Sequence, residues 1–144
     1  MSLALVTSRA LVGLAAPEVR VEVHLANGLP AFNLVGLPEA AVKESRERVR
    51  SALLTSGFEF PAKRITVNLS PADLPKEGGR YDLALALGIL AASNQIPTAS
   101  LAGKEFIGEL ALNGELKPVK GLLPTALATC QAGRELIMPS ANLT

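Results

Sequence analysis

The chain has 144 residues, is 49% hydrophobic but only 3% aromatic, and carries a formal net charge of +1. This length predicts one domain, residues 1–144, with a core of aliphatic side chains. The near-neutral charge does not by itself indicate a nucleic-acid or membrane-surface protein, although it leaves room for a local basic face.

Strands are expected in the first third of the chain. Every odd position of Val19–Leu25 is apolar and every even position is polar, which is typical of a half-buried strand. Asn27-Gly28 ends this strand, and Ala31–Val35 is expected as the next one. The earlier run Leu3–Leu14 predicts another strand or a hairpin.

A helix is expected after the turn at Gly36, because Pro38 suits its first turn and Gly57 its C-terminal end. Opposite charges spaced four residues apart support an exposed helix, in the pairs Glu39/Lys43, Lys43/Glu47 and Glu44/Arg48.

Three cations, Lys43, Arg46 and Arg50, share one face of this helix. Such a stripe can track phosphates, but Glu39 and Glu47 interrupt its positive field. The interruption favours an ordinary solvated face over nucleic-acid contact.

The middle of the chain returns to a strand, Arg64–Leu69, which follows Lys63. Two prolines make the next loop irregular, and the helix that begins near Asp82 is apolar on every side, so we expect it to be buried. Its apolar run, Leu83–Ala92, is roughly half as long as a membrane span requires.

The last third is expected to contain a hairpin, a helix and a strand. Phe106–Leu110 meets Glu115–Val119 across a turn with Asn113-Gly114, which is a hairpin signal. The helix Leu122–Ala132 and the strand Glu135–Met138 follow. The fold class is therefore α/β (α+β), a mixed sheet with packed helices rather than an alternating doubly wound fold.

The single cysteine and the N-terminus indicate a cytoplasmic protein without membrane contact. One cysteine excludes an internal disulfide framework and fits a reducing cytosol, and the N-terminus has no signal-peptide pattern. Cys130 lies in the expected last helix, where we predict a packed, small apolar role for it.

The Pro75–Asp82 turn is the first place to look for chemistry, since polar loops on a rigid scaffold often carry active sites. Gly78-Gly79 is followed by arginine, and Gly103-Lys104 by glutamate, so neither is a phosphate loop. One histidine and one cysteine do not assemble a metal site. We therefore expect no catalytic, cofactor-binding or metal-binding residues in this chain.

Several ordered motifs resemble the catalytic domain of Lon proteases. They are Leu34–Pro38, Val42–Ser45, Pro75–Gly78 and Asn113–Val119. That family uses a serine activated by a lysine, and the resemblance places the serine at Arg80 and the lysine at about Leu123. Because nucleophilic catalysis needs a hydroxyl beside a base, we expect no protease activity.

The whole chain is more similar still to the N-terminal, Lon-like and magnesium-chelatase-like domain of the YifB/ComM family of AAA+ ATPases. The specific stretches are Phe32–Pro38, Lys43–Arg50 and Asn68–Gly78. The resemblance implies a ribosomal protein S5 domain 2-like fold and an ATPase module, with its ATP and Mg²⁺, after residue 144 of the parent protein. It also implies self-association into a ring, expected to be a hexamer, that acts on branched DNA during recombination in natural transformation.

Two functions follow. In the first, this is a non-catalytic assembly and DNA-contacting domain, whose candidate nucleic-acid or subunit contacts are Lys43, Arg46, Arg50, Lys63, Arg64, Lys76 and Arg80. In the second, a hydrolase or chelatase-associated activity uses Lys76, Glu77, Arg80 and Asp82. The composition of the turn is also explained without chemistry, by a bend at its glycines, a helix cap from Asp82 or its neighbours, and solvated Lys76 and Glu77. Arg80 is then left as a long cation free to meet a subunit or a phosphate.

Overall fold

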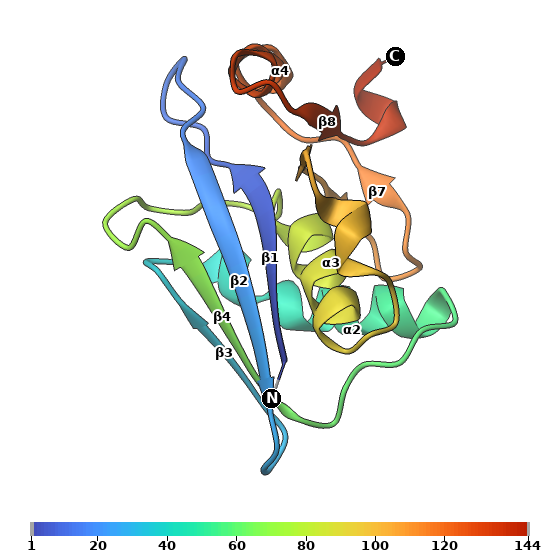
Figure 1. Ribbon diagram of the computed structural model, residues 1–144. Coiled ribbons are helices and arrows are strands. Elements are labelled where there is room, and N and C mark those ends of the chain that lie inside the picture. The colour runs from blue at the N-terminus through green and yellow to red at the C-terminus, as the bar shows by residue number, and fades with distance from the viewer. Residues whose placement is uncertain (1, 144) are drawn as a thin grey trace.

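A six-stranded mixed sheet with the strand order β3-β4-β2-β1-β5-β8 forms the frame of the protein (Figure 1). The computed structural model describes residues 2–143. Strands β1, β2 and β4 pair antiparallel, whereas β3 runs parallel to β4, β5 to β1 and β8 to β5. This arrangement confirms the predicted mixed α/β architecture. In chain order the elements are β1 Ser2–Arg9, β2 Glu18–Ala26, β3 Ala31–Val35, α1 Ala40–Lys43, α2 Ser45–Thr55, β4 Arg64–Ser70, α3 Asp82–Ala92, η1 Thr98–Leu101, β5 Lys104–Phe106, β6 Glu109–Leu110, β7 Leu116–Lys117, α4 Leu122–Gln131, β8 Glu135–Ile137 and η2 Ser140–Leu143.

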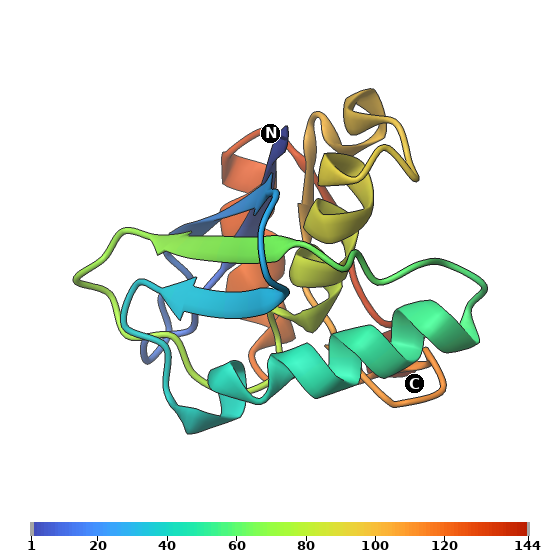
Figure 2. The ribbon, with the colours of Figure 1, turned by 90° about the horizontal axis from the view of Figure 1, so that it is seen from below.

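One face of the sheet is the floor of the hydrophobic core. The alternating residues of β2 that were expected to point inward, from Val19 to Leu25, are buried, and their neighbours on β4 continue the same layer. Helices α2 and α3 lie over this face (Figure 2). Successive strand residues point to opposite faces, so the period of two in the sequence maps directly onto this layer.

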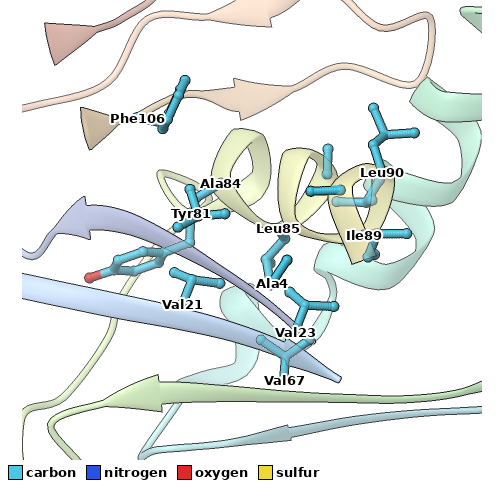
Figure 3. Close-up of a cluster of buried hydrophobic side chains, with 14 of the residues drawn as sticks. Ala4, Val21, Val23, Val67, Tyr81, Ala84, Leu85, Ile89, Leu90 and Phe106 are labelled. Carbon is cyan, nitrogen blue, oxygen red and sulfur yellow. The ribbon is translucent and has the colours of Figure 1, made fainter. Parts of the chain in front are cut away.

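Helix α3 is the central element of the core. Leu85 and Ile89 are fully buried and face the sheet, close to Ala4 and Val23 (Figure 3). At Gly88 an added Cβ would come within 2.6 Å of the Val23 Cγ2 atom, so glycine lets the helix approach β2 closely. The prediction of a buried helix is confirmed. No helix within residues 2–143 is long and apolar enough to cross a bilayer.

Two predicted elements are interrupted in the structure. The first helix is divided at Glu44, which ends α1 and precedes α2. The expected strand Phe106–Leu110 is also split, since its start belongs to β5 and its end pairs with β7 in a small hairpin. The reason lies at Gly108, whose N–H donates to the Arg80 carbonyl while its own carbonyl accepts from Leu83 N–H. These bonds draw the chain off the main sheet.

Helix α4 corrects the prediction for Cys130. Its thiol is exposed, and the residues that α4 turns inward are Thr125 and Thr129. Thr129 donates a hydrogen bond of 2.7 Å to Glu105, and Thr125 accepts one of 3.0 Å from Arg80. Polar partners beneath the helix therefore decide which of its faces is buried.

The charge pairs predicted along α1 and α2 also differ from those observed. Within residues 2–143 none of the three four-residue pairs forms an ion pair. Instead Arg46 contacts the adjacent Glu47 at 2.5 Å, and Arg48 turns inward to Asp82. The break at Glu44 changes the helical phase on which that spacing depends.

Candidate functional site

The Pro75–Asp82 turn is held between the start of α1 and the hairpin β6–β7. The Lys76 N–H donates to the Leu37 carbonyl at 3.2 Å, and the Lys76 carbonyl accepts from Glu39 N–H at 2.9 Å. Gly78 has a φ of 73°, the left-handed region that favours glycine. An added Cβ at Gly79 would meet the Glu109 carboxylate at 2.4 Å. Glycine therefore suits the backbone path at position 78, and a side chain at position 79 would require the Glu109 side chain to move.

Lys76 is fully buried, which corrects its placement as a solvated residue or a surface contact. Its Nζ atom donates to the Gly36 carbonyl at 2.5 Å and also to the Pro71 carbonyl. Burial lowers the pKa of this ammonium, and the negative charge of Asp73 opposes that effect. The lysine thus joins two loops, the β3–α1 and β4–α3 connections, and cannot reach a ligand.

Arg80 occupies the position where the Lon resemblance places a serine, and three hydrogen bonds hold its side chain. Its Nε donates to the Arg9 carbonyl at 2.9 Å, Nη1 to the Lys120 carbonyl at 3.0 Å and Nη2 to the Thr125 hydroxyl at 3.0 Å. Burial lowers its pKa. The arginine is 8% exposed, which corrects the prediction that it is free to meet a subunit or a phosphate.

The residue of α4 that faces position 80 is Thr125, and this corrects the placement of the lysine position at Leu123. Leu123 is 70% exposed, whereas Thr125 is fully buried and bonded to Arg80. A guanidinium stays protonated and accepts no hydrogen bond, so it cannot act as the base for the threonine hydroxyl. The two facing positions form a structural contact rather than a nucleophile with its base.

Asp82 does not cap its helix. It is the first residue of α3, is buried, and binds Arg48 through contacts of 2.6 and 3.1 Å. It also accepts the Leu110 N–H at 3.0 Å. Burial raises the pKa of this carboxyl, and the Arg48 hydrogen bonds offset only part of that effect. The aspartate ties α2, α3 and β6 together.

A second buried network lies beside Arg80 and centres on Glu105 of β5. Arg9 binds this carboxylate bidentately at 2.6 and 2.9 Å, and Arg134 reaches it at 2.9 Å. Burial opposes ionisation of Glu105, but hydrogen bonds from Arg9, Thr129 and Arg134 outweigh it and lower its pKa. Sequence reasoning missed this network. The one available signal was Thr125 and Thr129, spaced four residues apart on an otherwise apolar helix.

A cleft of about 730 Å³ opens above these residues, between the β1–β2 connection, the Pro75–Asp82 turn and the segment before α4. Glu39, Glu77 and Glu109 line it, and the Glu39 carboxylate already accepts the Gly78 N–H at 2.7 Å. Tyr81 also lines it. Its hydroxyl is buried without a hydrogen-bond partner among residues 2–143, and burial raises its pKa to about 12. Three of the four residues considered for a hydrolase are thus internally bonded, and only Glu77 remains at the surface.

The other predicted contact residues lie on the surface in two groups. Lys43, Arg46 and Arg50 are exposed along α1 and α2, whereas Lys63 and Arg64 are exposed at the start of β4. In the first group Arg46 and Arg50 stand four residues apart on α2, Lys43 lies on α1 before the break at Glu44, and Glu47 pairs with Arg46. The structure brings neither Lys76 nor Arg80 to either group.

The fold and the arginine at position 80 indicate a Lon-like domain without the serine of the proteases. The sequence matches agree with this class. The family described as subunit ChlI of Mg-chelatase matches residues 21–142, and the chain belongs to this family. It is 59% identical over 142 residues to competence protein ComM of Haemophilus influenzae and 55% identical to the YifB protein of Salmonella typhimurium. These matches confirm the resemblance to the YifB/ComM family. Lon protease 2 of Bacillus subtilis is 29% identical over 140 residues, 87% of this chain and 25% of that protease.

The relatives are much longer than the matched region. Both matches cover 99% of this chain but only 28% of ComM or of YifB. The chain therefore spans little more than a quarter of the curated relatives that it matches.

Proposed function

We propose that this chain is the non-catalytic assembly and DNA-contacting domain of a ring-forming, magnesium-chelatase-like AAA+ ATPase in the cytoplasm. The parent protein would form a hexamer through self-association and bind ATP and Mg²⁺ in an ATPase module after residue 144. It would move branched DNA during recombination in natural transformation. The family match and the name of the competence protein ComM support this proposal.

The observation that carries the non-catalytic part is the fastening of Arg80. An arginine with three internal hydrogen bonds stands where a Lon protease has its nucleophile, and a threonine faces it from α4. In this proposal the Lon-like fold is retained without its catalytic pair, and Arg80, just before α3, connects β1 with α4.

The DNA-contacting part rests on the exposed cations. Lys43 on α1 and Arg46 and Arg50 on α2 are exposed, and none of the three has a buried partner among residues 2–143. Each cation that neutralises a phosphate of duplex DNA steepens the decline of log affinity with log salt by about 0.9. If all three make contacts, their joint removal lowers the slope by about 2 to 3.

A titration of forked and single-stranded DNA at two salt concentrations tests this contact. We expect Lys43→Glu/Arg46→Glu/Arg50→Glu to weaken binding and flatten the salt dependence, and Lys117→Glu, an exposed cation on β7, to leave both unchanged. Binding that is equally strong in the triple variant would remove the stripe from the proposal. An absence of DNA binding at low salt, both for the chain and for the full-length protein, would remove the DNA-contacting function.

A further inference from the structure

Helix α4 buries polar side chains and exposes apolar ones, the reverse of the usual pattern. It buries Thr125 and Thr129, while Leu123 and Leu127 are 70% and 55% exposed. The helix carries no charged residue from end to end. A surface helix of a globular protein normally turns its leucines inward. The outward leucines therefore have no role in the core that the described residues form.

The tip of the β1–β2 hairpin carries two more exposed apolar side chains. Val12 and Ala15 exchange two backbone hydrogen bonds, which close a tight turn, and Val12 and Leu14 are 52% and 93% exposed. The tip lies against the start of α4, because an added Cβ at Gly121 would come within 2.5 Å of the Leu11 side chain. We call Val12, Leu14, Leu123 and Leu127 the α4 surface.

The C-terminal end of the described chain is anchored at the same place. The Asn142 side chain accepts the Val119 N–H at 3.0 Å and donates to the Val119 carbonyl at 2.8 Å. Val119 stands three residues before α4. Figure 1 shows the hairpin tip, α4 and the C-terminus at one end of the molecule. The end of the described chain therefore lies near the start of α4.

We propose that the α4 surface is the docking site for the ATPase module, which would follow in the same chain. This inference rests on the proposed function, since it requires that module. The ComM and YifB relatives are long enough to contain it, because the region matched here is 28% of each.

The small area of the α4 surface favours this occupant over a second copy of the chain. A stable contact between separate proteins buries about 800 Å² on each partner, more than four side chains supply. A short tether instead gives the two surfaces an effective concentration in the millimolar range, so a small patch is sufficient. The anchor at Val119 places the start of that tether near α4.

The exposed thiol of Cys130, one turn beyond Leu127, is a natural probe of this contact. The experiment follows maleimide labelling of Cys130 by peptide mass spectrometry in the full-length protein, with the 144-residue chain as the reference. We expect labelling to be about tenfold slower in the full-length protein, because docking covers the helix. Leu127→Asp should restore the fast rate. Leu29→Asp, an exposed leucine in the β2–β3 connection at the opposite end, should not.

Each outcome has one meaning. A full-length protein that hydrolyses ATP but labels as fast as the 144-residue chain overturns the inference and leaves the proposed function intact. Protection that disappears on dilution assigns the surface to a second copy, which also overturns it. A parent protein without an ATPase module overturns both proposals.

Discussion

Replacing Arg80 with alanine tests whether the former nucleophile position now acts as a structural tie. The change leaves the Arg9 carbonyl and the Thr125 hydroxyl buried without a donor, and each such loss costs about 1 to 3 kcal/mol. The Lys120 carbonyl is only partly buried and can recruit water. After allowance for the hydration that the guanidinium regains, we expect a loss of about 3 kcal/mol in the free energy of unfolding.

Equilibrium urea unfolding followed by circular dichroism measures this loss, and thermal unfolding should show a decrease in Tm of roughly 10 °C. Arg20→Ala is the matched control, because the Arg20 side chain is 55% exposed and its pairing with Glu18 should contribute less than about 1 kcal/mol. If Arg80→Ala and Arg20→Ala lose the same small amount, the hydrogen bonds around Arg80 do not hold the turn and the reasoning is refuted.

Three further predictions concern other buried groups. Tyr81 is the one tyrosine of a chain without tryptophan, so absorbance at 295 nm follows its ionisation alone. Its pKa is raised from 10.0 to about 12, so its contribution to the free energy of unfolding should be complete below pH 10 and fall by about 2 to 3 kcal/mol as pH rises through 12. Tyr81→Phe should abolish this loss. The pKa of Glu105 is lowered, so its stabilisation is present above the ordinary glutamate value of 4.5 and lost as pH falls through its folded pKa. Glu105→Gln should therefore cost about 3 kcal/mol at pH 7 and much less under acid, as judged by urea unfolding; an equal cost at both pH values would contradict this. Gly36→Ala would place a Cβ 2.0 Å from the Leu69 carbonyl oxygen and should prevent stable folding. Gly103 has a φ of 71° and open space around it, so Gly103→Ala should cost only about 1 to 2 kcal/mol. Similar thermal unfolding of the two variants would refute the steric argument.

The sequence was informative where side chains obey a local period. The alternation of Val19–Leu25 predicts β2 because a strand buries every second residue. The uninterrupted apolar run after Asp82 predicts the buried helix α3, because a helix that is apolar on every side is enclosed by the core. The hairpin around Asn113-Gly114 follows from turn chemistry for the same reason. Each of these signals lies within a few residues of the element it predicts.

The candidate site could not be predicted in the same way, because its contacts join distant segments. Arg80 binds a carbonyl 71 positions earlier, and Asp82 binds an arginine 34 positions earlier. Charged residues are rarely buried unless they are paired, so Lys76 and Arg80 were expected at the surface and Asp82 or a neighbour as a helix cap. Only the three-dimensional structure shows the partners that make their burial possible.

The central proposal, that this domain contacts DNA, is tested most directly by measuring whether the full-length protein uses ATP to move the branch point of a DNA junction. With Lys43→Glu/Arg46→Glu/Arg50→Glu, we predict that ATP hydrolysis without DNA continues while migration is lost at moderate salt, and that Lys117→Glu migrates normally. Unchanged migration by the triple variant would contradict the account.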